Sequence, residues 1–316
     1  MKNFNIYILL FLMCFISNCD VILEPDISNI IVPLKSPGNN FTSTQESQTF
    51  WWDFVAGATF YNIQIVSPSF DAVQQLITDS EVETNTFEQS LPPGEYEWTV
   101  IAYNNSYVSK SEIYKLTIEE ATTLENQTVL LVAPINNTII NNNPTRLLWQ
   151  TLSIAENYAI QIATPDFTNS IYIVSEDTTT NDYFDILDLT DGTYQWRVKA
   201  LNSNSSTEYT EDNFTVDRTP PTNPILNSPN DGSTFFLNNN ITLSWTSSSD
   251  AVQDTLFITR DLGQSDEVVL TLPTLDQTYT FIDSTSTNSQ TYFWQIKSVD
   301  VVGNVSTSSS REFYVQ

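Results

Sequence analysis

The chain has 316 residues, and its 38 aspartates and glutamates outnumber its 11 lysines and arginines, giving a formal net charge of −27 at pH 7. A surface this acidic repels phosphate groups, so nucleic acid is excluded as a partner. Histidine is absent, which removes the commonest general base and metal ligand, and no zinc, nucleotide or phosphate motif is present. We therefore expect no enzyme activity, no cofactor and no metal site.

The first 19 residues predict export. Lys2 precedes an apolar run, Ile6–Ile16, which ends at Ser17-Asn18-Cys19. A positive start, a short apolar run and small or polar residues after it are typical of a secretory signal peptide. The run is too short for a transmembrane helix, which needs about 20 residues.

Ile16-Ser17-Asn18-Cys19 resembles the lipobox of bacterial lipoproteins, in which the cysteine becomes the first mature residue and is acylated. The family prefers Leu in place of Ile16 and Gly or Ala in place of Asn18, and the looser pattern here is similar to that of Bacteroidota-type lipoproteins. The resemblance implies a signal peptide over residues 1–18, lipidation at Cys19, the membrane as a partner through this N-terminal lipid, and an outer-membrane location in the cell envelope. The alternatives are an ordinary signal peptide with a chance cysteine, and an uncleaved anchor.

Cysteine usage is consistent with lipidation. The two cysteines are Cys14 and Cys19, so a chain cleaved before Cys19 keeps one thiol and forms no disulfide within itself. Several acyl chains make a stable anchor, at about 0.8 kcal/mol per buried CH₂. Residues 19–32 are then predicted to be a tether between the lipid and the first folded unit.

Beyond the tether, tryptophan recurs with one period. Two series with spacings of 96 to 98 residues run through the chain: Trp52, Trp149 and Trp245, and Trp98, Trp196 and Trp294. Two interleaved series with the same period predict three copies of one structural unit. A period near 97 is close to the length of a seven-stranded β-sandwich.

The residues around these tryptophans carry strand patterns. Tyr96–Ala102 in the first copy and Tyr194–Ala200 in the second share the pattern Tyr-x-Trp-x-Val-x-Ala, which has the two-residue period of a half-buried strand. These motifs resemble fibronectin type III and bacterial Ig-like domains. The resemblance covers roughly residues 33–316 and implies an all-β chain of three tandem fibronectin III/Ig-like β-sandwich domains, over residues 33–119, 128–217 and 222–316.

The same resemblance assigns roles to aromatic residues. The early-strand tryptophan of each copy belongs to the core, and Tyr96 and Tyr194 correspond to the tyrosine corner. The third copy departs from this pattern, because Asp254 stands where the first two copies have tyrosine. We expect the two tryptophans of each domain to come from opposite sheets and to meet across the sandwich.

The segments between copies differ in composition. Residues 119–127 are acidic and polar, which predicts some bending, whereas residues 217–224 contain three prolines and predict a stiff linker.

Acidic residues recur at every third position over 182–191, which is not the pattern of a calcium loop and predicts a solvated edge. Asp300 and Asn304 in the third copy suit either a calcium ligand set or a side-chain-capped turn.

Three aromatic residues are candidates for ligand contact. If Trp52 points into the core, its neighbour Trp51 points out of the sheet, where an exposed indole stacks on a sugar or anchors a protein partner. Partial burial under a neighbouring segment is the alternative for Trp51. Tyr103 and Tyr107 flank residues 104–106, a predicted hairpin tip suited to recognition, although tyrosine is also common at the base of loops.

These features favour a lipid-anchored, non-catalytic binding or adhesion module of the cell envelope, with a protein or a glycan as its ligand. One alternative is a glycan-capturing lipoprotein of a polysaccharide-uptake system, since Pro229–Phe235 looks like the opening of starch-utilisation lipoproteins. A purely structural spacer is another. Paired carboxylates hydrolyse glycosides in some enzymes, but an enzyme would need a further domain, for which three copies leave no room.

Overall fold

The computed structural model describes residues 24–260, 266–273, 277–284 and 288–316. The predicted signal peptide and Cys19 lie outside the described residues. The chain forms two compact units, of which the second comprises Gln45–Ser47 and Glu120–Gln316. The first unit holds one β-sandwich, domain 1, and the second holds two, domains 2 and 3. In the described part of the chain, no helix is long and apolar enough to cross a membrane.

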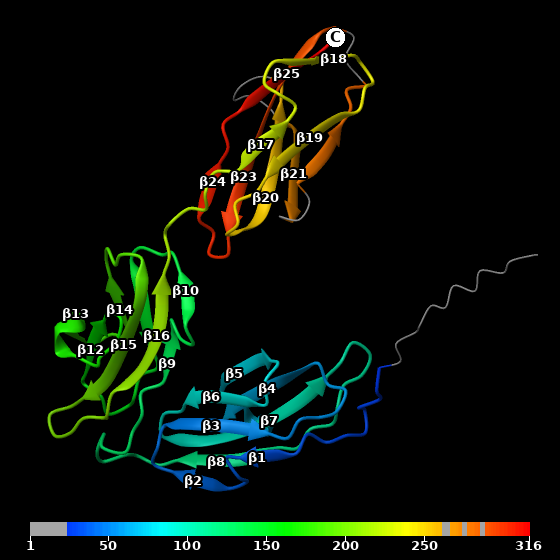
Figure 1. Ribbon diagram of the computed structural model, residues 1–316. Helices are drawn as coiled ribbons and strands as arrows, with labels where there is room; N and C mark the ends of the chain where they lie inside the picture. The colour runs from blue at the N-terminus through cyan, green and yellow to red at the C-terminus, as the bar shows by residue number, and fades with distance from the viewer. Residues whose placement is uncertain (1–23, 261–265, 274–276, 285–287) are drawn as a thin grey trace, which may run out of the picture. The chain divides into compact units, whose positions relative to one another are not determined.

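Domain 1 packs a three-stranded sheet against a five-stranded sheet (Figure 1). The small sheet has the order β1-β3-β6 and the large sheet the order β2-β8-β7-β4-β5. The strands are β1 (Leu34–Ser36), β2 (Phe41–Ser43), β3 (Ser47–Trp52), β4 (Phe60–Ser67), β5 (Gln75–Val82), β6 (Thr86–Ser90), β7 (Gly94–Tyr103) and β8 (Tyr114–Ile118). A short 3₁₀ turn, η1 (Phe70–Ala72), precedes β5.

Domain 2 repeats this arrangement, with the small sheet in the order β14-β11-β9 and the large sheet in the order β10-β16-β15-β12-β13. A second 3₁₀ turn, η2 (Ser170–Tyr172), precedes β13. The strands are β9 (Leu131–Ala133), β10 (Thr138–Ile140), β11 (Thr145–Trp149), β12 (Asn157–Ala163), β13 (Ile173–Thr179), β14 (Tyr183–Ile186), β15 (Gly192–Leu201) and β16 (Thr210–Val216).

Domain 3 has the same two sheets, in the orders β17-β19-β22 and β18-β25-β23-β20-β21, and a short strand β24 added to β23. The strands are β17 (Ile225–Ser228), β18 (Ser233–Phe235), β19 (Ile241–Thr246), β20 (Ala251–Thr259), β21 (Asp266–Pro273), β22 (Thr278–Phe281), β23 (Gln290–Asp300), β24 (Val305–Thr307) and β25 (Arg311–Val315).

The first two strands of every domain are connected in the same way. The chain leaves the small sheet at a cis-proline, Pro37, Pro134 or Pro229, and crosses to the large sheet. There it pairs in parallel with the last strand, as β2 with β8, β10 with β16 and β18 with β25. The three copies thus share one topology, and the predicted class of three tandem fibronectin III/Ig-like β-sandwiches is confirmed.

Each domain has its own core, built on its tryptophan pair. Trp52, Trp149 and Trp245 come from the small sheets, and Trp98, Trp196 and Trp294 from the large sheets. All six side chains are at most 2% exposed, so the predicted burial from opposite sheets is confirmed. The ring centroids of Trp149 and Trp196 lie 6.5 Å apart, whereas Trp98 in domain 1 meets Phe50 edge-on at 5.0 Å.

The segment before β1 belongs to the core of domain 1. Ile27 and Val32 are fully buried there, and the Lys110 N–H donates to the Ile30 carbonyl at 2.8 Å. The tether predicted over residues 19–32 is therefore corrected, because residues 27–32 are packed on the sandwich. The Ile27 and Val32 side chains lose water contact by packing into the core of domain 1.

The segment before β9 repeats this feature in domain 2. Leu124, 97 residues after Ile27, is fully buried in the second core, and its N–H donates to the Ser205 hydroxyl at 2.9 Å. Pro221, a further 97 residues on, is also buried. Residues 119–127 are thus only partly a linker, since Leu124 and the residues beside it belong to domain 2.

The tyrosine corners predicted in the first two domains are present. Each tyrosine hydroxyl donates to a backbone carbonyl four residues upstream, at 2.6 Å from Tyr96 to Pro92 and 2.9 Å from Tyr194 to Thr190. Both hydroxyls thereby satisfy a polar group that the core would otherwise leave without a partner. In domain 3, Tyr292 instead donates to the Asp283 carboxylate at 2.7 Å.

Asp254 explains how the third copy departs from the other two. Tyr61 accepts a backbone N–H from Val55 in domain 1, whereas Asp254 is fully buried and accepts from the Trp245 indole N–H at 2.7 Å. The Ser298 hydroxyl donates to the same carboxylate at 2.6 Å. A buried carboxylate is tolerated because these donors replace its water.

Trp196→Ala should destabilise domain 2 by about 3–5 kcal/mol, because it removes a buried indole that also donates to the Pro134 carbonyl at 2.8 Å. Calorimetry of the mature chain measures this as a lower melting temperature for one of its transitions. Trp51→Ala, an outward substitution on β3, should change stability by no more than about 0.5 kcal/mol. An unchanged thermogram for Trp196→Ala would contradict the core assignment.

Asp254→Ala should destabilise domain 3 by about 3–5 kcal/mol, because it leaves the Trp245 and Ser298 donors buried without an acceptor. Asp254→Asn keeps one acceptor oxygen and should cost less than Asp254→Ala. Denaturant unfolding of both variants measures the order, and equal losses would argue against the hydrogen-bond account.

Candidate functional site

The outer face of the small sheet in domain 1 presents Trp51 to solvent. Alternation along β3 buries Trp52 completely and leaves Trp51 40% exposed. The inward and outward directions expected for these two residues are therefore observed. Phe54, just after β3, is 68% exposed, so the same end of the domain carries a second accessible ring.

Polar groups surround Trp51 on this face. Asp53, two residues further along the chain, pairs with Lys35 of β1 at 2.9 Å. Thr49, two residues before it, donates from its hydroxyl to Glu88 of β6 at 3.4 Å. An indole flanked by hydrogen-bonding groups offers an apolar ring face for stacking and polar groups that fix orientation.

The three copies provide an internal test of whether the fold requires this tryptophan. Trp51 pairs with Ser36 across the small sheet, and the same register in the other domains pairs Leu148 with Ala133 and Ser244 with Ser228. The sheet thus forms with tryptophan, leucine or serine at the outward position. The fold does not require Trp51, whereas Trp52 and its counterparts are tryptophan in all three copies.

Tyr103 and Tyr107 have structural contacts. Tyr103 stacks on Phe60, with ring centroids 5.0 Å apart and planes 3° from parallel. Tyr107 is partly buried against the core of domain 1. Between them, Asn104 accepts the Tyr107 N–H at 2.7 Å and donates to the Gly57 and Pro25 carbonyls. Ligand contact by these two tyrosines stays a prediction, and neither lies beside Trp51 in the sheet register.

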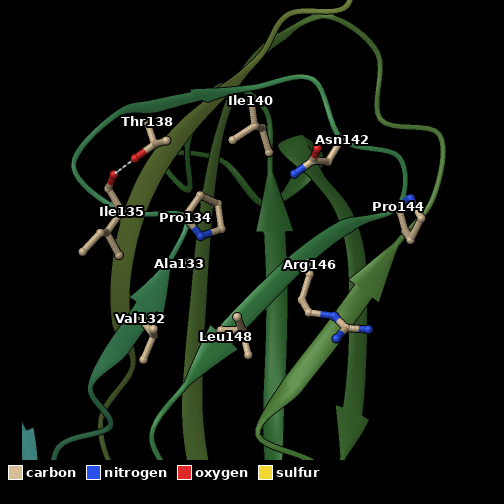
Figure 2. A pocket seen from close by; sticks show the side chains of 10 residues that line it. All are labelled: Val132, Ala133, Pro134, Ile135, Thr138, Ile140, Asn142, Pro144, Arg146 and Leu148. Carbon is tan, nitrogen blue, oxygen red and sulfur yellow. Dashed lines mark hydrogen bonds between the residues drawn. The ribbon is translucent and has the colours of Figure 1, made fainter. Parts of the chain in front are cut away.

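A hollow of about 360 Å³ lies in domain 2 (Figure 2). It is framed by β9, the loop that follows it, β10, and the outward side chains of β11. The lining is largely apolar: Val132, Ala133, Pro134, Ile135, Thr138, Ile140, Asn142, Pro144, Arg146 and Leu148. This volume lies within the range of small-ligand sites. Leu148 occupies the register position of Trp51, so the hollow and the tryptophan face are corresponding parts of two domains.

Arg146 forms the polar end of the hollow. Its guanidinium makes two hydrogen bonds to the Asp185 carboxylate, both 2.7 Å, and lies 4.4 Å from the centre of the Tyr183 ring. The hydrogen bond from Arg146 lowers the pKa of Asp185, and the same bond raises the pKa of Arg146. This arrangement holds Arg146 in place at one end of a largely apolar cavity.

The hollow was not predicted from the sequence. The sequence feature that distinguishes it is a difference between the copies. Domain 2 has the apolar residues Val132, Ile135 and Leu148, whereas domain 3 has Asn227, Asn230 and Ser244 at the corresponding positions. An alignment of the three copies by strand register would have identified it.

Three acidic residues that the sequence singled out, Asp185, Asp188 and Asp300, act as hydrogen-bond acceptors. Asp185 pairs with Arg146, and Asp188 accepts from the Asn143 side-chain amide at 3.0 Å. Asp300 accepts the Val302 and Asn304 N–H groups, both at 2.9 Å, which is a side-chain-capped turn. Among the described residues, no group of three acidic or thiol side chains is placed to hold a metal ion.

No protein-family model and no curated protein matches the sequence. Among solved structures, the chain is similar to chicken CNTN1 FN1-FN3 domains, with 14% sequence identity, a TM-score of 0.41, and coverage of 90% of this chain and 96% of that one. It is also similar to fibronectin(III)-like modules of Clostridium thermocellum CbhA, with 13% identity, a TM-score of 0.37, and coverage of 60% and 93%. Relations this distant do not bear on function.

Acid should weaken the capped turn of domain 3. Burial alone would raise the pKa of Asp300. The hydrogen bonds from Asn304 and from the turn's N–H groups outweigh this effect, so the pKa lies below the ordinary 3.8. The pKa of this carboxyl is lower in the folded chain than in the unfolded chain, where it is near 4. Its contribution to the free energy of unfolding is therefore complete at a pH above about 4, and it is lost as the pH falls through the folded-state pKa. Asp300→Asn should therefore destabilise the protein at pH 6 and approach wild type at pH 2–3 in urea unfolding. A difference that is constant over this range would contradict the account.

Proposed function

We propose that this chain is an exported, lipid-anchored, non-catalytic binding protein of the cell envelope, held by acylation at Cys19. Support comes from the N-terminal apolar run, the lipobox-like residues and a mature chain without further cysteines. The acidic surface favours solubility and repels phosphate-bearing partners. An outer-membrane location is part of this proposal.

Trp51 is the observation that carries the binding role. It is 40% exposed on a sheet that, in domain 3, also forms with serine at the same register. An exposed tryptophan that the fold does not require, set among hydrogen-bonding side chains, is typical of a contact residue for a glycan or a protein. Tyr103 and Tyr107 are secondary candidates, because both have contacts within domain 1.

A glycan is the first ligand class to test. Sugar rings stack on indoles through their C–H faces, while the Lys35–Asp53 and Thr49–Glu88 pairs supply groups for hydroxyls. A structural spacer is the competing function, and it predicts that no outward side chain of domain 1 matters.

Anchoring is tested by labelling cells with a clickable fatty acid. Wild type should carry the label and Cys19→Ala should not, because the glycerol that bears the acyl chains is attached through a thioether to the Cys19 sulfur. Protease treatment of intact cells then distinguishes a surface-facing protein from one that faces the periplasm. Absence of label on both forms would refute lipid anchoring.

Ligand binding is tested by affinity electrophoresis in gels that contain a panel of soluble polysaccharides. Trp51→Ala should lose at least about tenfold in affinity for whichever polysaccharide retards wild type, which is a typical loss for an interface hot spot. Val174→Ala, also exposed but in domain 2, is the matched control and should migrate like wild type. Equal retardation of Trp51→Ala and wild type would remove Trp51 from the site.

A further inference from the structure

The hollow of domain 2 differs from its counterparts in chemistry and not in strand register. Three of its outward positions are apolar, Val132, Ile135 and Leu148. The corresponding residues are Lys35, Gly38 and Trp51 in domain 1, and Asn227, Asn230 and Ser244 in domain 3. Because domain 3 builds the same sheet with three polar residues, the apolar lining of domain 2 is not a requirement of the fold.

The hollow also lies between two sheet edges. β9 is the last strand of the small sheet and β10 the last strand of the large sheet, and the side chains of both strands line the cavity (Figure 2). The middle residues of these strands, Val132 and Ile139, are 44% and 46% exposed. An edge strand presents unpaired N–H and C=O groups, to which an extended peptide can add as a further strand.

Acidic side chains surround this position. Asp185 holds Arg146, Asp188 is bonded to Asn143 next to the lining residue Asn142, and Asp212 accepts the Asn136 N–H at 3.0 Å next to Ile135. A fourth carboxylate, Asp191, accepts the Arg218 N–H at 3.0 Å, and the Arg218 guanidinium donates to the Asn142 carbonyl at 2.6 Å. Of these four carboxylates only Asp185 pairs with a guanidinium, and the other three accept from an amide or from backbone N–H groups. With four carboxylates and the two guanidinium groups of Arg146 and Arg218, the charged groups beside the largely apolar cavity are net negative.

We propose that this hollow binds an extended peptide segment of a protein partner, with a leucine, isoleucine or valine side chain in the cavity and lysine or arginine residues on either side of it. The apolar lining selects the central side chain, the edge strand β9 pairs with the peptide backbone, and the acidic rim attracts the basic flanks. The site is separate from Trp51 and does not depend on the ligand proposed for domain 1.

The probe is an array of heptapeptides applied to the mature full-length chain. The central residue is varied among leucine, valine, serine and aspartate, and the flanking residues among lysine, threonine and glutamate. We expect the strongest retention for an aliphatic centre with lysine flanks, and an affinity about tenfold weaker for a serine centre. The affinity of the best peptide should fall as salt rises from about 50 to about 300 mM. Failure of the wild-type chain to select among these peptides would overturn the proposal.

Two variants replace a lining residue by the residue that domain 3 has at the same position, so they should preserve the fold. Leu148→Ser and Val132→Asn should each weaken binding of the selected peptide at least about tenfold in fluorescence anisotropy, with unchanged melting temperature. Val174→Ser, an exposed substitution on β13 of the same domain, should bind like wild type. Equal binding by Leu148→Ser and wild type would overturn the assignment to the hollow.

Trp51→Ala separates this proposal from the function proposed for domain 1. It should bind the selected peptide like wild type while losing retention by polysaccharide. If Trp51→Ala loses the peptide and Leu148→Ser keeps it, the peptide belongs to domain 1 and the present proposal fails, although a binding function would stand. If N-acetyl-leucine amide binds as tightly as the peptides, the site is one for a small apolar molecule, and the peptide proposal fails.

Discussion

The burial of two tryptophans, one from each sheet, is the interaction on which every domain of this chain depends. Outside the N-terminal segment the chain has no cysteine, so no disulfide joins the sheets. A buried tryptophan removes about 150–250 Å² from water, which at about 25 cal/mol/Å² corresponds to an upper bound of about 4–6 kcal/mol. That exceeds the roughly 2–4 kcal/mol typical of a disulfide. With the inward positions fixed in this way, outward positions such as Trp51, Leu148 and Ser244 are free to differ.

Much of the architecture could be predicted because it depends on periodicity. The 97-residue spacing of tryptophan predicts three copies, and the two-residue alternation predicts that Trp52 faces in and Trp51 faces out. The packing of Ile27 and Leu124 could not be predicted in this way. Neither belongs to a strand pattern: Ile27 is followed by Ile30 and Ile31, which are exposed, and Leu124 stands in a polar segment. Their burial becomes favourable only against the core of the folded sandwich.

In the candidate sites too, features set by local periodicity could be predicted and features set by tertiary packing could not. The outward direction of Trp51 follows from local alternation, whereas the hollow of domain 2 is lined by residues of β9, β10 and β11, which belong to both sheets, and this is a tertiary feature. Domain 3 shows a further limit. Replacing a core tyrosine by Asp254 looks unfavourable in the sequence, and it becomes acceptable only because the Trp245 indole and the Ser298 hydroxyl point at the same carboxylate.

The burial of Ile27 also limits how far domain 1 could lie from a lipid attached at Cys19. For a chain anchored at Cys19, only about seven residues separate the acylated cysteine from the packed segment, and fully extended they reach at most about 25 Å. Domain 1 would then work in a thin layer next to the bilayer, at high effective concentration for anything held on the same surface. Its natural ligands would be molecules that themselves lie at the membrane, such as envelope glycans or neighbouring anchored proteins, and not solutes captured at a distance.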